Sequence, residues 1–511
     1  MPKLVLLWVS ATFLAGIITA GATSITIEWS WGLILVALLF FFYRLNKKKK
    51  FGGTVLFLSL LLAAFYCGAL RYQSFVEKTT VGFGENITPG EMITIQGIVA
   101  EPTQPSTQYG ETVLELHRYL DPNGNWQPAE GKVVVRLPEF FGFRVHTSLT
   151  LQGIMDSTVK ADAKPYTSWL KRNGVDYRMF FPTVVEEIPS EKITFKGLLY
   201  SFRNRAYQTL QTIVPYPESE LLAGILLGID SRIPAYLSEA YRLTGTAHIL
   251  AISGFNIALI AGMVTKYLNR VLPYRLGAFI SMGIIATYAL LVGAQPSVLR
   301  AAWMAIIAIP AYLIGRRSIG IHTLAITAAI MAFFNPYLVW DASFQLSVCA
   351  TFGILMYTDF ITQKTDAFLQ KKDIPSKELV LEFIKNSVII AFSAQLAAFS
   401  VLARQFEEIS LISPLVNLFI LPLQPIIMIL GGVALVCGMV FYPLGRLVGL
   451  LAWMIAAFND QIVLLFSTVP TTLAINPVGG FWIGLGLNGV LAYFVLRERK
   501  RAFSQPGRAG S

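Results

Sequence analysis

Charge is scarce in this chain: Asp, Glu, Lys and Arg make up 14% of its 511 residues. Soluble globular chains carry roughly 25% charged residues, so the composition argues against an ordinary soluble domain. Hydrophobic residues reach 54% and the mean hydropathy is +0.58. Many separate apolar runs are long enough to cross a bilayer, which takes about 20 residues of helix. The composition therefore predicts an α-helical polytopic membrane protein.

Cysteine and histidine are also rare, with 3 and 4 copies. The cysteines lie far apart in separate apolar segments, and the histidines lack the spacing typical of metal ligands. These residues are Cys67, Cys349, Cys437, His117, His146, His248 and His322. We expect no disulfide, no metal site and no cofactor.

Motifs of catalysis are missing as well. The chain has no GxxxxGK[ST] loop, so it carries no nucleotide-driven motor of its own. No G-x-S-x-G pattern frames Ser253, so this serine does not occupy a nucleophile elbow. His248 and Ser253 are five positions apart and near one helix face, which leaves intramembrane catalysis as an alternative. Our expectation is that the protein is not an enzyme and has no catalytic residue.

Positive charge is in excess, with a net charge of +11. Cytoplasmic loops retain Lys and Arg, and an anionic substrate would also favour them; the total does not separate these causes. The run RLNKKKK at 44–50 marks a cytoplasmic loop. Alternate loops downstream are basic too, which predicts about twelve spans with both termini in the cytoplasm. These loops are 269–275, 316–317, 363–377 and 497–501.

The order of segments predicts five regions. They are transmembrane helices at 1–71, a β domain at 72–195, amphipathic and re-entrant helices at 196–245, a transmembrane domain at 246–497 and a basic cytoplasmic tail at 498–511. One apolar segment, 411–442, is too long for a single span, and Pro422 and Pro425 break helices. We therefore expect a break there, and the segment is either one span or two half-helices.

Residues 72–195 have the alternating, turn-punctuated pattern of short strands, with DPNGN at 121–125 as a hairpin turn. The pattern favours an extracytoplasmic barrel of the OB type, and any other small β domain is the alternative. Basic and aromatic residues alternate in it, as nucleic-acid binding requires; a solvated face with a core of aromatics is the plainer interpretation. The candidates for DNA binding are Arg136, Arg144, Trp169, Lys171 and Arg172.

Polar residues inside apolar spans are costly and therefore candidates for function. The stretch 244–263 is apolar yet contains His248, Ser253, Gly254 and Asn256, and a buried packing helix is the alternative to a hydrated wall. Further candidates for a polar path are Gln295, Arg300, Gln345 and Asn417. Two residues have structural roles: Asp341 as the N-cap of the following helix, and Pro422 as a break.

Several blocks in order give a resemblance to a known family. They are LLAGILLGIDSRIP, TGTAHILAISGFNIALI, QPSVLRAAWM, NPYLVWDASFQLSVCATFGIL and LISPLVNLFILPLQPIIMILGG, and YTSWLKRNGVDY resembles the close of an OB domain. Over about residues 88–470 the sequence resembles the ComEC family of competence proteins, the DNA-uptake channels of transformable bacteria. By position, the family's H-x-x-A-I-S-G, R-A, D-x-S-F-Q-L-S and N-x-x-x-x-P blocks correspond to His248, Ser253, Gly254, Arg300, Asp341, Phe344, Gln345, Ser347, Asn417 and Pro422.

The resemblance implies a channel in the bacterial inner membrane that passes one DNA strand inward. The implied partners are single-stranded DNA, the lipid bilayer, an outer DNA receptor, a cytoplasmic ATPase and a separate nuclease. Two departures matter. Asn256 replaces a histidine usual in the family, and Asn does not titrate near neutral pH. No H-x-H-x-D-H motif of a metallo-β-lactamase-like domain is present, so we expect no nuclease activity.

A channel for another polar or anionic solute is the rival hypothesis.

Overall fold

The computed structural model describes residues 4–23, 52–80, 90–105, 110–121, 123–138, 143–157, 170, 174–190, 194–313, 319–371, 379–406, 408–469, 472–474 and 476–504. The chain folds into two compact units. The first comprises Met1–Asn204 and Ala325–Asp341, and the second comprises Arg205–Leu324 and Ala342–Ser511. The basic run at 44–50, expected to be a cytoplasmic loop, lies outside the described residues.

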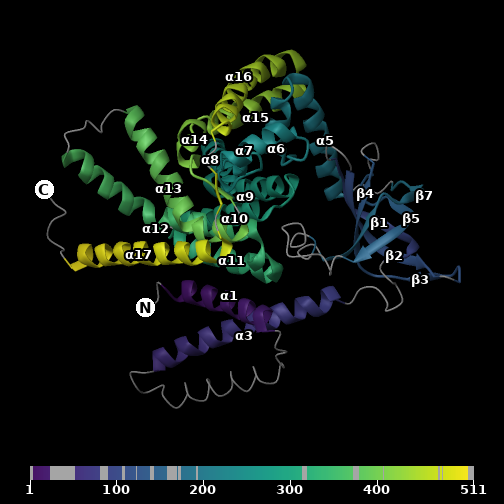
Figure 1. The fold of residues 1–511 in the computed structure, drawn as a ribbon, viewed down its shortest axis with the longest axis horizontal. Helices are drawn as coiled ribbons and strands as arrows, with labels where there is room; N and C mark the ends of the chain where they lie inside the picture. The colour runs from purple at the N-terminus through teal and green to yellow at the C-terminus, as the bar shows by residue number, and fades with distance from the viewer. Residues whose placement is uncertain are drawn as a thin grey trace. The chain divides into compact units, whose positions relative to one another are not determined.

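Two apolar helices of the first unit, α1 (Val5–Thr23) and α3 (Gly52–Thr80), pack along each other (Figure 1). Glycines permit the close approach, because a Cβ at Gly16 or Gly68 would collide with a backbone carbonyl of the other helix. Small residues at helix contacts are typical of membrane bundles, where backbones must approach closely to gain van der Waals contact. The side chains of Phe13 and Ile17 pack with Ala332 near the end of α11 (Gly320–Phe334).

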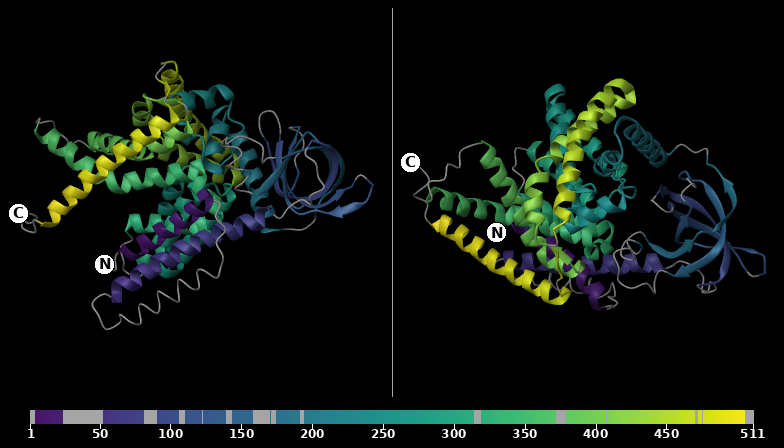
Figure 2. Two further views of the ribbon diagram at one scale, coloured as in Figure 1. Left: turned by 60° about the horizontal axis from the view of Figure 1, so that its bottom comes forward. Right: turned by 45° about the horizontal axis from the view of Figure 1, so that its top comes forward.

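The β domain is a closed barrel. Its strands are β1 (Met92–Pro105), β2 (Gly110–Leu120), β4 (Lys132–Leu137), β6 (Val175–Phe180) and β5 (Ser148–Ser157), in that order, with β5 pairing back to β1. Only β4 and β6 run parallel. Two short strands extend the ring: β3 (Trp126–Pro128) pairs with β2, and β7 (Thr183–Ile188) pairs with β5. Figure 2 shows the strands curving around a shared interior.

Alternation along the strands fills this interior. On β4, Val133, Val135 and Leu137 are fully buried and share one core with residues of β1, β2, β5 and β6. The predicted turn at 121–125 joins β2 to β3, and the Asp121 carboxylate accepts hydrogen bonds from the amides of Asn123 (3.0 Å) and Asn125 (2.8 Å). The prediction of a β domain from alternating short strands is confirmed.

The second unit is helical. Its elements, with α5 beginning in the first unit, are α5 (Phe195–Ile213), α6 (Glu218–Leu227), α7 (Ala235–Leu243), η2 (Ala247–Ile249), α8 (Gly254–Val271), α9 (Tyr274–Leu291), α10 (Pro296–Leu313), α12 (Ala342–Lys371), α13 (Leu379–Gln405), β8 (Glu408–Ser410), α14 (Ser413–Ile420), α15 (Gln424–Val440), α16 (Tyr442–Ser467), β9 (Thr472–Ala474) and α17 (Pro477–Ser504). One buried core joins α5, α6, α7, α14, α15 and α16, and another joins α8, α9 and α10.

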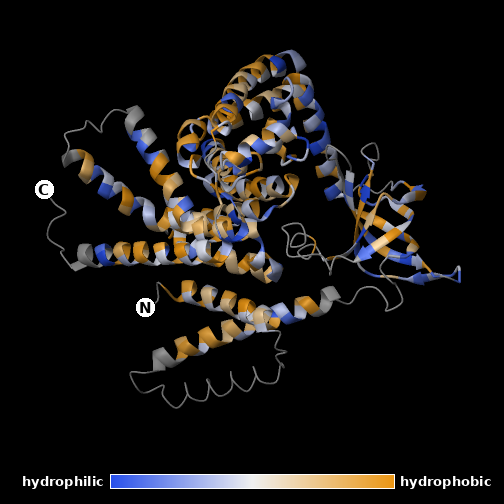
Figure 3. Ribbon diagram, in the orientation of Figure 1, coloured by the Kyte–Doolittle hydropathy of each residue, from blue (hydrophilic) through white to orange (hydrophobic). Residues whose placement is uncertain are grey.

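Nine helices among the described residues are long and apolar enough to cross a membrane. Figure 3 shows apolar residues along α1, α16 and α17. The pair α14 and α15 forms a tenth candidate, bent by 45° at residues 421–423, so the break expected at Pro422 is present. Helix α11 is apolar but has only 15 residues, short of the about 20 that a perpendicular span needs. The chain is a multi-pass membrane protein.

Residues Ala247–Val271 form one candidate membrane span, but the helix is interrupted within it, because η2 ends at Ile249 and α8 begins at Gly254. The expectation that His248 and Ser253 lie near one face of a helix is therefore wrong. Two short strands follow α13 and α16: β8 and β9 pair antiparallel, with Ile409 opposite Leu473.

Candidate functional site

Ser253 and Asn256 fix the start of α8. Ser253 is the N-cap, with an extended backbone, and its hydroxyl accepts a hydrogen bond from the Asn256 amide (3.4 Å). The same hydroxyl donates to Asn256 Oδ1 (3.1 Å). Such caps satisfy the amides that the first turn of a helix leaves without partners. The polar residues of this stretch are thus needed to begin a helix inside an apolar segment.

The end of α6 is capped by side chains from its neighbours. The last four carbonyls of a helix have no partner within it. Asn256 Nδ2 donates to the Ile225 carbonyl (3.3 Å), and the Tyr288 hydroxyl of α9 donates to the Leu226 carbonyl (2.9 Å). Gly228 ends α6 with φ of 69°, a left-handed conformation that glycine adopts without strain. Asn256 therefore links the start of α8 to the end of α6.

Arg300 lies against this junction. Its side chain is 9% exposed on α10, and one guanidinium nitrogen, Nη2, occupies the space where a Cβ on Gly254 would stand. Nη1 donates to the Thr351 hydroxyl of α12, and Nε has no hydrogen-bond partner among the residues that the structure describes. Within the described part of the chain, Arg300 forms no ion pair with a carboxylate. The structure thus brings together Gly254 and Arg300, which the sequence placed on separate blocks.

A second group of buried polar side chains surrounds Ser413. Its hydroxyl accepts from Gln395 Nε2 (2.9 Å) and from Asn417 Nδ2 (3.3 Å), and it donates to the Gly245 carbonyl (3.2 Å). Asn417 is 2% exposed, and in the described part of the chain its Oδ1 has no hydrogen-bond partner. The group joins α13, α14 and the turn after α7. Ser413 and Thr351 were not predicted, because a single hydroxyl in an apolar helix gives no distinctive signal.

The remaining candidates lie apart from these two groups. His248 is exposed, on η2. Gln295 precedes α10 and its carbonyl accepts from the Leu299 amide (2.9 Å). Gln345 is half-buried on α12. Asp341 is buried and directly precedes α12, at the N-cap position, and Pro422 lies in the break between α14 and α15.

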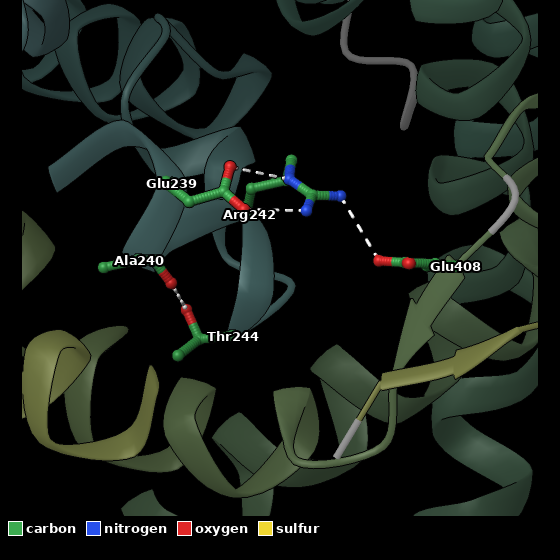
Figure 4. Close-up of polar contacts among 5 residues, drawn as sticks. All are labelled: Glu239, Ala240, Arg242, Thr244 and Glu408. Carbon is green, nitrogen blue, oxygen red and sulfur yellow. Dashed lines mark hydrogen bonds and ion pairs between the residues drawn. The ribbon is translucent and has the colours of Figure 1, made fainter. Parts of the chain in front are cut away.

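The turn after α7 is tied to β8 by charge. Arg242 donates to both carboxylate oxygens of Glu239 (2.8 and 2.7 Å) and pairs with Glu408 of β8 (3.4 Å), as Figure 4 shows. Thr244 donates to the Ala240 carbonyl (2.9 Å) and ends the helix. Hydrogen bonding to Arg242 lowers the pKa of Glu239 from its ordinary value of 4.5. The ion pairs fix the backbone that leads into His248.

The barrel carries a cationic and aromatic surface on β4 and β6. Arg136 Nε pairs with Glu111 (2.6 Å), and the guanidinium carbons of Arg136 and Arg178 each lie 5.1 Å from the centre of the Phe180 ring. Arg144 is exposed in the turn before β5. Trp169, Lys171 and Arg172 lie outside the described residues. Arg136 is thus partly neutralised by Glu111, which the sequence did not indicate.

The family model described as "Competence protein" matches residues 225–501, more than half of the 511 residues. The chain belongs to this family. The match begins within α6 and includes Asn256, Arg300, Thr351 and Ser413. Both polar groups described above therefore lie in the region that defines the family.

Curated relatives align over parts of the chain. ComE operon protein 3 of Bacillus subtilis is 24% identical over 270 residues, which cover 53% of this chain and 32% of the relative. An uncharacterized protein of Aquifex aeolicus is 32% identical over 135 residues (26% and 32%), and YcaI of Escherichia coli is 26% identical over 240 residues (44% and 30%). The chain thus spans about a third of the length of each. No solved structure matches.

Proposed function

We propose that this protein is a channel that passes single-stranded DNA across the bacterial cytoplasmic membrane during natural transformation. The observation that carries the proposal is Arg300, a buried cation with hydroxyl and thioether partners and no carboxylate within the described residues. Burying a charge in a membrane domain costs free energy, so a buried charge there is a candidate for function. A passing phosphate would supply the missing anion, as a charge-assisted contact. Membership of the competence family supports the same assignment.

We assign the barrel to the OB type. In support, β1, β2, β4, β6 and β5 close a ring in which only β4 and β6 are parallel. OB barrels bind single strands on the face of their second and third strands and on adjoining loops. Here those strands are β2 and β4, which carry Glu111 and Arg136, and the connection from β5 to β6 contains Trp169, Lys171 and Arg172. We place this domain outside the cytoplasm, where it would receive the strand.

We place the driving force and strand degradation on other proteins. The sequence contains no phosphate-binding loop, so a separate cytoplasmic ATPase would pull the strand. Basic loops favour both termini in the cytoplasm. Intramembrane catalysis by Ser253 and His248 has little support, because the two residues belong to different elements and the Ser253 hydroxyl bonds Asn256. We therefore propose a passive channel rather than an enzyme.

The full chain reconstituted in a planar bilayer tests the proposal. We expect a conductance that single-stranded oligonucleotides block when voltage drives them into the pore. Arg300→Gln should weaken the block by about tenfold or more, since a charged hydrogen bond contributes about 1.5–3 kcal/mol. Arg300→Lys should retain part of it. Arg275→Gln, at an exposed position at the start of α9, is the matched control and should leave the block unchanged.

An abasic strand of the same length separates DNA passage from the rival function, a channel for other anions. It carries the same phosphates without bases for stacking. Equal block by the abasic and the ordinary strand would favour a general anion path. A bilayer with no conductance would refute the channel. A block by single-stranded DNA that Arg300→Gln leaves intact would refute the role of Arg300.

A further inference from the structure

A buried carboxyl lies in the middle of α16, separate from the group around Arg300. Asp460 is 3% exposed and its neighbour Asn459 is fully buried. The Tyr241 hydroxyl of α7 donates to Asp460 Oδ1 (2.7 Å) and accepts from Asn459 Nδ2 (2.6 Å). These bonds satisfy Tyr241 completely. Each of the two partners, Asp460 and Asn459, has one further side-chain oxygen, which does not bond to Tyr241.

Among the described residues those two oxygens have no hydrogen-bond partner: Asp460 Oδ2 and Asn459 Oδ1 are both buried and both acceptors. Desolvating an ionised carboxylate without a counter-charge costs far more than one neutral hydrogen bond returns. An unpartnered amide oxygen adds a cost of about 1–3 kcal/mol. The site therefore lacks one positively charged or donating group.

None of the helices packed against α16 supplies that group from its described residues. Helices α14 and α15 contain no charged residue. On α6, the Glu218 carboxylate accepts from Trp453 Nε1 (3.0 Å), and Glu220 accepts from Tyr207 (2.9 Å). On α7, the cation Arg242 is exposed and paired with Glu239.

Helix α7 has one exposed and one buried face. Tyr236, five residues before Tyr241, is 57% exposed, whereas Leu237, Ala240 and Tyr241 are buried. The helix that donates to Asp460 therefore also reaches the surface of the second unit.

We propose that Asp460, with Asn459 and Tyr241, is a proton-binding site within the membrane domain. A proton on Oδ2 cancels the buried charge and converts an orphaned acceptor into a donor, for which Asn459 Oδ1 is an available acceptor. When the proton leaves, the carboxylate keeps only the Tyr241 hydroxyl as a donor, and this bond between α7 and α16 becomes charge-assisted and stronger. The site thus couples proton uptake to the contact between these two helices.

The ligand is a proton rather than a metal ion because the donor set is small. A Ca²⁺ site takes about six to eight oxygens, and within the described residues no three His, Cys, Asp or Glu side chains form a metal-binding group. One proton satisfies the charge with no further ligand. A monovalent cation such as Na⁺ is the competing occupant, and the experiment distinguishes it.

Carbodiimide labelling of the full chain in liposomes tests the site. A hydrophobic carbodiimide takes up the proton of a carboxyl in apolar surroundings, the carboxylate oxygen then adds to its central carbon, and mass spectrometry of the α16 peptide quantifies the rearranged N-acylurea. We expect labelling of Asp460 at about pH 6 that falls several-fold by about pH 9, as a carboxyl titrates. Sodium chloride should leave the labelling unchanged. Protection by Na⁺ would instead identify a cation site, and an unlabelled Asp460 across this range would overturn the proposal.

Two variants separate proton binding from a structural role. Asp460→Asn should abolish the label while preserving shape. Tyr241→Phe removes the hydroxyl that stabilises the ionised form, so the labelling midpoint should move to higher pH by about one unit or more. A midpoint that stays in place, or moves to lower pH, in Tyr241→Phe would refute the proposed role of the hydroxyl.

Discussion

Gly254, the first residue of α8, lies directly against the guanidinium of Arg300 on α10. Only a residue without a Cβ leaves room for Nη2, while Nη1 is held by Thr351 on α12. One glycine therefore decides where the buried cation of the membrane domain stands. This relationship gives the first of four predictions.

Gly254→Ala should displace Arg300 and weaken DNA block of the reconstituted channel severalfold. The new Cβ meets the far end of a long side chain, so the loss of stability should be small for an overpacking change, about 1 kcal/mol. Thermal unfolding and current block measure the two effects. Gly262→Ala on the same helix is the control, because nothing lies within 4 Å of its Cβ position. If single-stranded DNA blocks the Gly254→Ala and Gly262→Ala channels equally well, the contact between Gly254 and Arg300 has no role in DNA passage.

Asn256→Ala should destabilise the membrane domain by about 1–3 kcal/mol, because the Ile225 carbonyl loses its donor in a buried position. Asn256→Asp keeps an acceptor for Ser253 but cannot donate to Ile225, so it should be at least as destabilising. Denaturant unfolding in detergent measures both. Ser253→Ala, which removes the cap alone, should cost about 1 kcal/mol. An Asn256→Asp variant as stable as the natural protein would contradict the capping of α6.

Acid should remove the contribution of the Glu239–Arg242 ion pair to the stability of the folded protein. The pKa of Glu239 is lowered in the folded protein, so the stabilisation is present above its ordinary value of 4.5 and lost as pH falls through the lower folded value. Both side chains are more than half exposed, so the effect should be about 0.2–1 kcal/mol and vanish in high salt.

Melting temperatures between about pH 7 and about pH 3 measure this loss of stability in acid. Arg242→Gln should abolish the loss, because the ion pair is already absent. Lys364→Gln, which breaks the exposed pair with Glu498, should leave it in place. Identical acid profiles for the Arg242 variant and the natural protein would show that the pair contributes nothing.

Glu111→Gln should strengthen binding of single-stranded DNA by the full chain, because it frees Arg136 from an ion pair of 2.6 Å. One more phosphate contact should steepen the dependence of log affinity on log salt by roughly 0.7. Fluorescence anisotropy with a labelled oligonucleotide measures both. Glu115→Gln, an exposed change of equal charge on the same strand, controls for net charge. Equal gains in the two variants would refute a specific role of Arg136.

Features set by short-range chemistry could be predicted. The β domain followed from alternation along strands such as 132–137, and the break between α14 and α15 followed from Pro422 and Pro425, which no continuous helix accommodates. The start of α8 at Gly254 was missed, although Ser253 followed three residues later by Asn256 has the spacing of a cap. The polar residues of the apolar stretch 244–263 were instead interpreted as candidates for a polar path through the membrane.

The candidate site was predictable only in part. Arg300 and Gly254 were both identified, but their contact was not, and neither was Thr351, 51 residues from Arg300 in the chain. Glu111 was overlooked because only the register of β2 on β4 places it opposite Arg136. Three-residue strands such as β8 and β9 are too short to show alternation, so only their pairing reveals them.

The sequence by itself determined the class of this protein, a multi-pass membrane protein of the competence family with an inserted β domain. The free energy of transferring a helix into a bilayer is a sum over its residues, so composition and the length of apolar runs suffice to identify membrane helices. Only the tertiary structure decided which buried polar groups meet. Tyr241 reaches Asp460 across 219 residues, and Gly254 leaves room for Arg300. Such contacts depend on how helices pack against each other, which no local pattern in the sequence encodes.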